Sequence, residues 1–199
     1  MSVERASFRL GTGDALIVVD VQNDFLPDGN LAVPAGDEVV PVLNRYLKRF
    51  GDRRLPVFAT RDWHPADHCS FAAQGGPWPP HCIAGSRGAA FAPGLELPTT
   101  ATVISKATRS EQDAYSGFGG TDLASRLRQA GVGRLFVGGL ATDYCVLQTV
   151  LDGLQAGFAC VLLLDAVRAV EVHPGDGAAA IRAMTEAGAR TARLAEIAP

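Results

Sequence analysis

Short, continuous runs of apolar residues recur along the chain, and longer stretches of mixed character separate them. Apolar runs without polar alternation are typical of parallel strands that are buried on both faces. Such strands usually belong to a sheet that helices cover on both sides. The predicted strands span residues 15–19, 56–60, 101–106, 134–137, 158–164 and 190–194.

Most of the intervening stretches carry apolar residues every three or four positions, which is the period of an amphipathic helix. In the first of them, Val40, Leu43, Leu47 and Phe50 fall on one face. Glycines mark two of the expected helix ends, because glycine readily takes the left-handed conformation that follows a helix. The predicted helices span residues 36–50, 121–131, 145–157 and 176–187.

Strands that alternate with helices predict βαβ units with right-handed crossovers. The expected fold class is therefore α/β, with three layers (α/β/α), a six-stranded, mostly parallel sheet and a Rossmann-like arrangement. We expect one domain over residues 1–199, since neither a linker nor an internal repeat interrupts the pattern. Residues 65–97 are the exception: they are rich in proline and glycine, follow neither period, and are long enough to indicate a functional loop.

Reactive side chains follow four of the predicted strands at the point where each strand ends. Asp20 follows the first strand, and Asp62 and His64 follow the second. Lys106 ends the third, and the fourth leads through a short turn to Cys145. Ligands of open α/β sheets bind outside the carboxyl ends of the strands, so we expect these side chains to meet there. Four such strand ends together predict a functional site.

The turn formed by residues 138–146 places Cys145 at the mouth of a helix. Unpaired N–H groups and the positive end of the helix dipole favour the thiolate, which is the nucleophilic form. A nucleophilic thiol also needs a base, which Asp20 supplies if burial raises its pKa, and a cation such as Lys106. The alternative is a buried Asp20–Lys106 salt bridge without chemistry, but the nearby cysteine favours the catalytic interpretation.

Three of the four histidines lie in one segment together with an aspartate. Asp62 and His64 are two positions apart, which puts both side chains on the same side of a strand. Carboxylate plus imidazole suits Zn²⁺, Fe²⁺ or Mn²⁺ rather than Ca²⁺. We therefore predict a site for one divalent transition metal ion, preferably zinc, held by Asp62, His64, His81 and His68. For His68, direct ligation, a water-mediated contact and a contact with substrate are all left open.

Three aromatic residues, Phe25, Trp78 and Tyr115, lie in loops beside these reactive groups. Such residues often serve only to pack a loop. The alternative interpretation is a narrow slot that binds a flat ring between aromatic faces. We predict that these three residues contact the substrate.

Composition narrows the class of protein further. The 199 residues carry a net charge of −3 and no basic run, which argues against nucleic acid or an anionic membrane as a partner. The first apolar run is too short for a signal peptide or a membrane span, so we expect a cytoplasmic protein with free thiols. Cys69 and Cys82 adjoin histidines, but no cysteine pair has the spacing of metal ligands. The expected partner is a small-molecule substrate, and a homo-oligomer is left open.

Five short stretches of the chain form a recognisable set of motifs between Leu16 and Asp165. They are residues 20–25 (Asp-Val-Gln-Asn-Asp-Phe), 62–65 (Asp-Trp-His-Pro), 78–82 (Trp-Pro-Pro-His-Cys), 105–106 (Ser-Lys) and 139–145 (Gly-Leu-Ala-Thr-Asp-Tyr-Cys). Together they resemble the nicotinamidases of the isochorismatase-like cysteine hydrolase superfamily. Asp20, Lys106 and the turn with Cys145 match residues that are common to the superfamily. The second and third stretches occur in fewer of its members and resemble nicotinamidases in particular.

The resemblance implies a six-stranded parallel sheet, a catalytic triad of Asp20, Lys106 and Cys145, and a divalent metal ion beside it. It also implies a cis peptide between Leu140 and Ala141, which would aim the N–H groups of Ala141 and Cys145 at one oxyanion. The implied reaction is the hydrolysis of nicotinamide to nicotinate and ammonia through a thioester, a step of NAD salvage.

Other functions fit parts of the same pattern. An amidase of the superfamily that acts on a carbamoyl or ureide substrate would need neither a ring slot nor a metal ion for a ring nitrogen. A vinyl ether hydrolase of the isochorismate type is disfavoured by Cys145. A catalytically silent interaction module is disfavoured because Asp20, Lys106 and Cys145 are all present.

Overall fold

The strands form a single sheet in which every neighbouring pair is parallel. The computed structural model describes residues 8–198, so the ends of the domain predicted for residues 1–199 lie outside the described residues. The six-stranded sheet has the order β3-β2-β1-β4-β5-β6, which confirms the predicted fold class. The strands are β1 (Asp14–Val19), β2 (Val57–Asp62), β3 (Thr102–Lys106), β4 (Arg134–Leu140), β5 (Ala159–Arg168) and β6 (Arg190–Ala192).

The strand order reverses between β1 and β4, which lie side by side at the centre of the sheet. The chain runs outward from β1 to β3 on one side and from β4 to β6 on the other. In a doubly wound sheet, the crevice at this switch point is where ligands bind, beyond the carboxyl ends of the two central strands. The loops that follow β1 and β4 are therefore the first place to look for a site.

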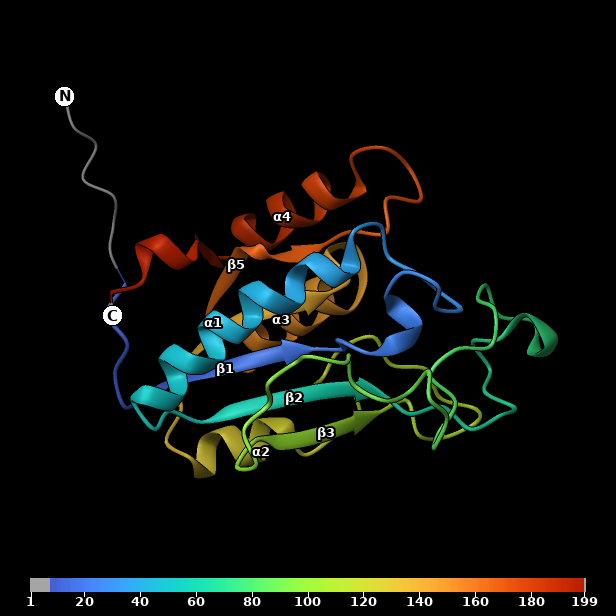
Figure 1. The fold of residues 1–199 in the computed structure, drawn as a ribbon, viewed down its shortest axis with the longest axis horizontal. Coiled ribbons are helices and arrows are strands. Elements are labelled where there is room, and N and C mark those ends of the chain that lie inside the picture. The colour runs from blue at the N-terminus through green and yellow to red at the C-terminus, as the bar shows by residue number, and fades with distance from the viewer. Residues whose placement is uncertain (1–7, 199) are drawn as a thin grey trace.

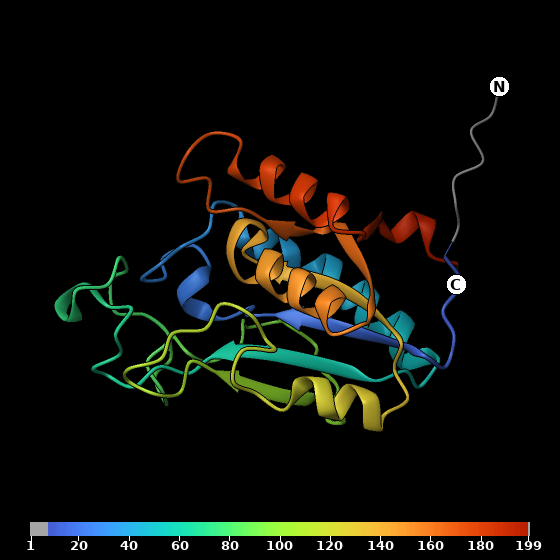
Figure 2. The same ribbon diagram turned by 180° about the vertical axis from the view of Figure 1, so that it is seen from behind.

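Helices cover both faces of the sheet (Figures 1 and 2). Helix α1 lies in front of the sheet in Figure 1, whereas α2 and α3 lie on the opposite face, which Figure 2 shows from behind. Helix α4 packs against α3 on that second face. The helices are α1 (Val39–Asp52), α2 (Leu123–Gln129), α3 (Leu147–Gln155) and α4 (Asp176–Glu186).

Each face of the sheet has its own apolar core, because alternate residues of a strand point to opposite faces. On the α1 side, the ring of Phe50 meets Phe136 of β4 edge to face, with ring centroids 5.5 Å apart. Val39 and Tyr46 belong to the buried face of α1, whereas Val40, which the sequence placed on it, is only partly buried. The helix begins at Val39 after a short 3₁₀ turn, and the other predicted positions, Leu43, Leu47 and Phe50, are buried.

The end of β4 approaches β1 more closely than a side chain would permit. At Gly139 the backbone has φ +127°, and a Cβ atom there would lie 2.1 Å from the carbonyl oxygen of Val19. Only glycine fits this position. One residue further on, the peptide bond between Leu140 and Ala141 is cis, as the family resemblance implied.

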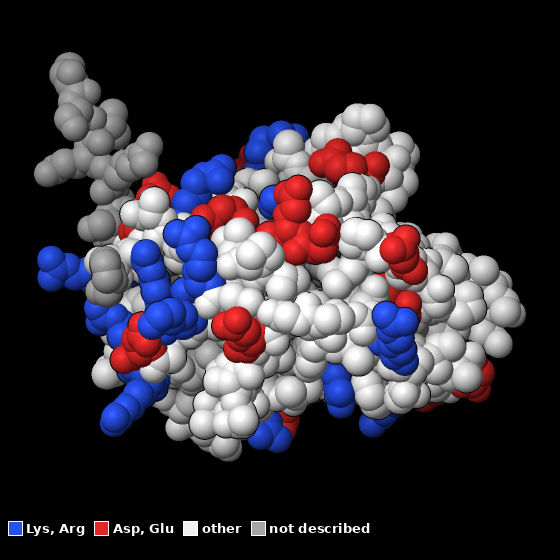
Figure 3. All heavy atoms as spheres, viewed as in Figure 1, with Lys and Arg blue, Asp and Glu red and all other residues white. Residues whose placement is uncertain are grey.

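Residues 65–97 have little regular structure, as predicted. Apart from a short 3₁₀ turn, Ala72–Gln74, they consist of loops joined by isolated bridges such as His64 with Ile83. Most of them extend beyond the carboxyl ends of β2 and β3, on the right in Figure 1, and the last few run back along α1, where Asn44 bonds Gly94 and Glu96. On the face shown in Figure 3, Lys and Arg side chains gather at the opposite end, and the loop end is largely uncharged. None of the helices between residues 8 and 198 is both long and apolar enough to cross a membrane.

Candidate active site and metal centre

A buried lysine lies at the centre of the groups predicted from the strand ends. Lys106, the last residue of β3, is 1% exposed. Its ammonium group contacts two carboxylates, Asp20 Oδ2 at 3.0 Å and Asp62 Oδ1, and donates to the carbonyl oxygen of Ala114 at 3.1 Å. Burial alone would lower the pKa of Lys106, but the two carboxylates hold it well above its usual range. The lysine therefore stays charged.

Asp20 is fully buried directly after β1. Its Oδ1 accepts a hydrogen bond of 2.6 Å from the Thr60 hydroxyl, and its Oδ2 faces Lys106. Burial raises the pKa of Asp20 to about 6, although Lys106 opposes the shift. A carboxyl group with this pKa is ionised at neutral pH and can still accept and return a proton, as a general base must.

The thiol of Cys145 completes this cluster. Cys145 lies in a π-helical turn, Thr142–Val146, that leads from β4 into α3, and its Sγ atom is 3.5 Å from the Lys106 ammonium group. Ligand-type atoms of Asp20, Asp62 and Cys145 all lie within 4.8 Å of one another. Asp20, Lys106 and Cys145, predicted from three separate strand ends, therefore meet at one place.

The protonation state of the thiol differs from the sequence-based expectation. The helix mouth predicted a stabilised thiolate at Cys145. In the structure, burial raises the pKa of the Cys145 thiol well above its usual range, and the nearby Lys106 opposes this only in part. The resting group is therefore a thiol, because the cost of charging it in a buried site exceeds the stabilisation available there. A base such as Asp20 is then essential, because it must remove the thiol proton as the sulfur attacks.

A second group of side chains has the composition of a metal site. One ligand-type atom from each of Asp62, His64 and His81 lies within 4.8 Å of the other two. The Nδ1 atoms of His64 and His81 lie 3.3 and 2.8 Å from the carbonyl oxygens of Ala107 and Pro79. A carbonyl only accepts, so Nδ1 carries the proton and the Nε2 lone pair of each ring is free to bind a metal.

An unsatisfied buried atom supports the same interpretation. The Nε2 atom of His64 is buried and has no hydrogen-bond partner among the described residues. Burial lowers the pKa of His64 to about 4, so this ring is neutral, as a ligand must be, at neutral pH. Two imidazoles and a carboxylate suit zinc and related ions. The residues present therefore fit a divalent transition metal ion.

His68, the fourth predicted ligand, lies beside this group and already has hydrogen bonds on both ring nitrogens. Its ring stacks near His64 with centroids 4.2 Å apart. The backbone N–H of Ser70 donates to Nδ1, and Nε2 lies 3.2 Å from the carbonyl oxygen of Gln112. The pattern gives Nε2 the proton, so direct ligation would require His68 to exchange these hydrogen bonds. Ligation by His68 stays a prediction.

A buried amide side chain holds the end of β2 that carries Asp62. Gln22 is fully buried, and its Nε2 donates to the carbonyl oxygens of Asp62 and Ala89 at 2.8 and 2.9 Å. Its Oε1 accepts the backbone N–H of Asp62 at 2.8 Å. The Gln22 side chain thus pairs with the backbone of Asp62 as a neighbouring strand would. It also connects Asp62, a candidate metal ligand, to Ala89 in the long loop.

Replacing Gln22 by alanine should lower the free energy of unfolding by about 2–4 kcal/mol, because buried backbone groups of Asp62 and Ala89 lose their partners and a cavity forms. Urea denaturation measures this. Asn23→Ala is the matched control, since the Asn23 side chain makes an exposed hydrogen bond to Arg87. Equal stability of the two variants would contradict the assigned role of Gln22.

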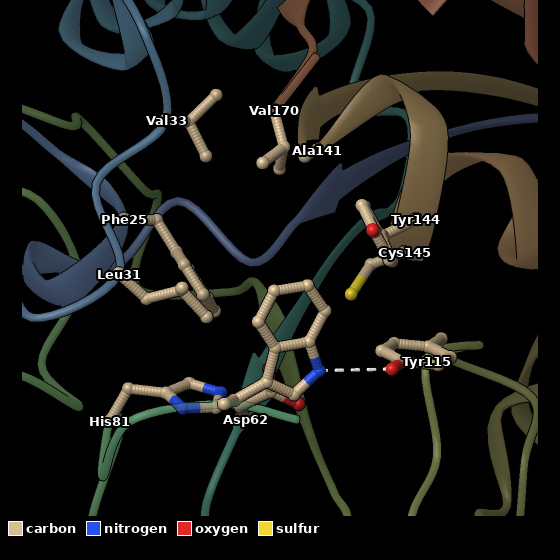
Figure 4. A pocket seen from close by; sticks show the side chains of 11 residues that line it. Phe25, Leu31, Val33, Asp62, His81, Tyr115, Ala141, Tyr144, Cys145 and Val170 are labelled. Atoms are coloured by element: carbon tan, nitrogen blue, oxygen red, sulfur yellow. Dashed lines mark hydrogen bonds between the residues drawn. The ribbon is translucent and has the colours of Figure 1, made fainter. Parts of the chain in front are cut away.

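A cavity of about 410 Å³, counting its open mouth, adjoins both groups (Figure 4). Asp62 and His81 lie on one side of it, and the Cys145 thiol points into it. Phe25, Trp78 and Tyr115, the predicted substrate contacts, all line it, as does Ala141, the predicted second oxyanion donor. A mostly apolar, aromatic lining with a few convergent polar groups is typical of sites for small molecules.

The cavity also has lining residues that sequence reasoning missed. Tyr144 lies against Trp78 and Tyr115, with ring centroids 5.2 and 5.6 Å apart, and the Trp78 indole N–H donates to the Tyr115 hydroxyl at 3.0 Å. The position of Tyr144 next to the cysteine was the available signal. Leu31, Val33 and Val170 supply an apolar wall, and nothing in their local sequence distinguishes them.

The fold and the site define an α/β protein with a buried Asp–Lys–Cys cluster at the switch point of the sheet and a candidate metal centre beside it. The sequence of residues 14–196 matches the family model of the isochorismatase domain. The chain belongs to the isochorismatase family.

Named relatives and solved structures are similar over nearly the whole chain. The nicotinamidase of Escherichia coli is 41% identical over 203 residues, covering 92% of this chain and 95% of that protein. A pyrazinamidase of Pyrococcus horikoshii, solved in complex with zinc, is 47% identical with a TM-score of 0.88, covering 92% of this chain and 99% of that one. PnC1 from L. infantum, solved in complex with nicotinate, is 36% identical with a TM-score of 0.90, covering 96% and 98%.

Proposed function

We propose that this protein is a metal-dependent cysteine amidohydrolase that converts nicotinamide to nicotinate and ammonia. The observation that carries the proposal is the position of the Cys145 thiol in an aromatic cavity with Asp62 and His81 on its other side. The similarity to a nicotinamidase and to structures with zinc and nicotinate supports the substrate and the metal. A flat ring with a carboxamide fits a slot lined by Phe25, Trp78 and Tyr115.

The first half of the reaction forms the thioester. Asp20 takes the proton from the Cys145 thiol as the sulfur attacks the carboxamide carbon. The backbone N–H groups of Ala141 and Cys145 hold the resulting oxyanion. Asp20 then gives the proton to the departing nitrogen, the C–N bond breaks, and ammonia leaves. Lys106 keeps its charge throughout and stabilises the ionised forms of Asp20 and Cys145.

The second half releases nicotinate. Asp20, again ionised, accepts a proton from a water molecule while the oxygen of that water attacks the thioester carbon. The same N–H groups hold the second oxyanion, and the C–S bond breaks. Asp20 returns the proton to the sulfur, which restores the Cys145 thiol. The sum is consumption of one amide and one water, with formation of one acid and one ammonia.

We propose that Asp62, His64 and His81 hold the metal ion, with His68 as a further candidate ligand. When bound, the ion supplies a Lewis acid beside the ring slot for the pyridine nitrogen. The chain itself orients the ring: Phe25, Trp78 and Tyr115 bind its faces and edges so that the carboxamide lies at Cys145. Zinc is the preferred ion, and iron and manganese are alternatives.

Activity should fall in acid because Asp20 must be ionised to act as a base. With the pKa of Asp20 raised to about 6 by burial, kcat/KM for nicotinamide should decrease tenfold per pH unit well below that value. A pH series of initial rates on the metal-loaded enzyme measures this. A profile that stays flat well below pH 6 would contradict the role of Asp20 as base.

An amidase for carbamoyl or ureide substrates is the alternative within the family. Such substrates lack an aromatic ring and would leave the aromatic walls without a partner. The test is a panel of nicotinamide, pyrazinamide and N-carbamoyl amino acids, with ammonia release as the readout. The proposal predicts the highest kcat/KM for the pyridine and pyrazine carboxamides. A preference for the ureides would overturn the substrate assignment.

We also propose a cytoplasmic location and a small-molecule substrate as the main partner. The four cysteines, Cys69, Cys82, Cys145 and Cys160, are all free thiols, as expected in a reducing compartment. Nucleic acid and membrane are not expected partners, given the net charge of −3. A homo-oligomer stays open, and size-exclusion chromatography with light scattering would decide it.

A further inference from the structure

The carboxylate of Asp143, in the turn that carries Cys145, holds the cavity wall that contains Val170. The two oxygens of Asp143 accept the backbone N–H groups of Val170 and Glu171, at 2.9 and 3.0 Å. Asp143 is two residues before Cys145, and Val170 lines the cavity. One side chain therefore connects the turn that presents the nucleophile to a wall of the substrate pocket.

The Val170 side chain packs against the apolar core on the α1 side, but few contacts hold the backbone that follows it. Strand β5 ends at Arg168, so Val170 lies outside the sheet ladder. The next residues, 171–175, are all exposed, and Val172 is 54% exposed, so no apolar side chain anchors them. The carboxylate of Glu171 accepts the N–H groups of Gly175 and Gly177 at 2.6 and 3.0 Å, which holds the far end of the connection. At the near end, Asp143 holds the backbone N–H groups of Val170 and Glu171.

The wall lies across the cavity from the candidate metal ligands. Figure 4 shows Val33 and Val170 on one side, with Asp62 and His81 on the other. A pyridine ring whose nitrogen faces the metal side turns its opposite edge toward the two valines. Substituents on that edge would meet Val170.

We propose that Asp143 is a positioning residue that sets the width of the ring slot by holding Val170 in place. The inference rests on the proposed function for the identity of the ring. It implies that the enzyme prefers carboxamides whose ring is unsubstituted on the edge away from the nitrogen. Asp143 itself does not contact the substrate.

The test compares Asp143→Asn, Val170→Ala and the wild-type enzyme on nicotinamide and 5-methylnicotinamide. Asparagine has the same shape but presents an NH₂ group to one of the two backbone N–H groups, so the wall loosens. The KM of Asp143→Asn for nicotinamide should rise about 5–30-fold while kcat changes about threefold or less, as expected for a lost hydrogen bond that affects binding. The ratio of kcat/KM for the methylated over the plain substrate should rise about tenfold in both variants. Asp52→Asn, which removes only an exposed ion pair with Lys48, is the charge-matched control.

A second readout does not depend on the substrate. The alkylation of Cys145 by iodoacetamide and by its bulkier N-phenyl analogue, followed by peptide mass spectrometry, reports the width of the slot. The ratio of the two rates cancels any change in thiol reactivity and should shift toward the bulky reagent in Asp143→Asn and Val170→Ala. An unchanged alkylation ratio in Asp143→Asn would overturn the inference, as would a loss confined to kcat. A shifted ratio in a protein that releases no ammonia from nicotinamide would instead refute the proposed function and leave the inference standing.

Discussion

Replacing Cys145 by alanine should abolish turnover of nicotinamide, lowering kcat by about 10⁴-fold or more, as removal of a catalytic nucleophile does. The side chain is the nucleophile of the proposed reaction, and without its sulfur atom the thioester cannot form. Binding should persist, because the ring contacts the aromatic walls and the metal side rather than the sulfur. Ammonia release measures the first effect, and calorimetric titration with nicotinamide measures the second.

Cys69→Ala is the control for the loss of a thiol. Cys69 is partly buried, lies outside the cavity lining and takes no part in the proposed reaction. This variant should keep near-normal turnover. Retained turnover in Cys145→Ala would refute the thiol mechanism, whatever the behaviour of the control.

Replacing Lys106 by methionine should lower both activity and stability. Methionine keeps the apolar length of the chain but leaves the carboxylates of Asp20 and Asp62 buried together without their cation. Removing one partner of a buried ion pair costs about 3–5 kcal/mol of unfolding free energy. Turnover should fall by about 10²-fold or more, since the proton of Asp20 is then released less readily and the developing charge loses its stabilising cation.

The pH dependence of stability distinguishes this electrostatic effect from a packing defect. Lys106 lowers the pKa of Asp20, so its loss moves the folded-state pKa of that carboxyl further above the unfolded value. A raised carboxyl pKa costs stability in alkaline solution, and the cost disappears as pH falls through the folded pKa. The loss of unfolding free energy in Lys106→Met, relative to the wild-type protein, should therefore be smaller in mildly acidic buffer. Urea denaturation of the metal-free proteins measures it. A deficit that is independent of pH would point to packing instead.

The sheet and the strand-end residues were predictable because they depend on local pattern and on one general rule. Apolar runs predicted the strands, and the carboxyl-end rule brought Asp20, Lys106 and Cys145 together, although they are far apart in sequence. The long, irregular segment was predictable from its proline and glycine content. The cis peptide before Ala141 came from the family resemblance, since local physics disfavours it.

The features that were missed depend on three-dimensional context. Gln22 reaches the backbone of a residue 40 positions away, and such a contact leaves no local pattern. Val170 lies beyond the end of β5, and its backbone N–H is bonded to Asp143, 27 positions earlier in the chain. The state of the Cys145 thiol depends on how deeply it is buried, which the position of the helix end did not reveal. Buried polar contacts and irregular backbone thus mark the limit of reasoning from the sequence.

Product formation from nicotinamide by the metal-stripped and the zinc-restored enzyme tests the proposed reaction most directly. Nicotinate and ammonia are quantified together, before and after zinc is added back to protein that has been treated with a chelator. The proposed mechanism predicts equal amounts of the two products from the zinc-restored enzyme, and a rate at least about 10²-fold lower after stripping, as for loss of a Lewis acid. No nicotinate from the zinc-restored enzyme, or the same rate in its stripped form, would contradict it.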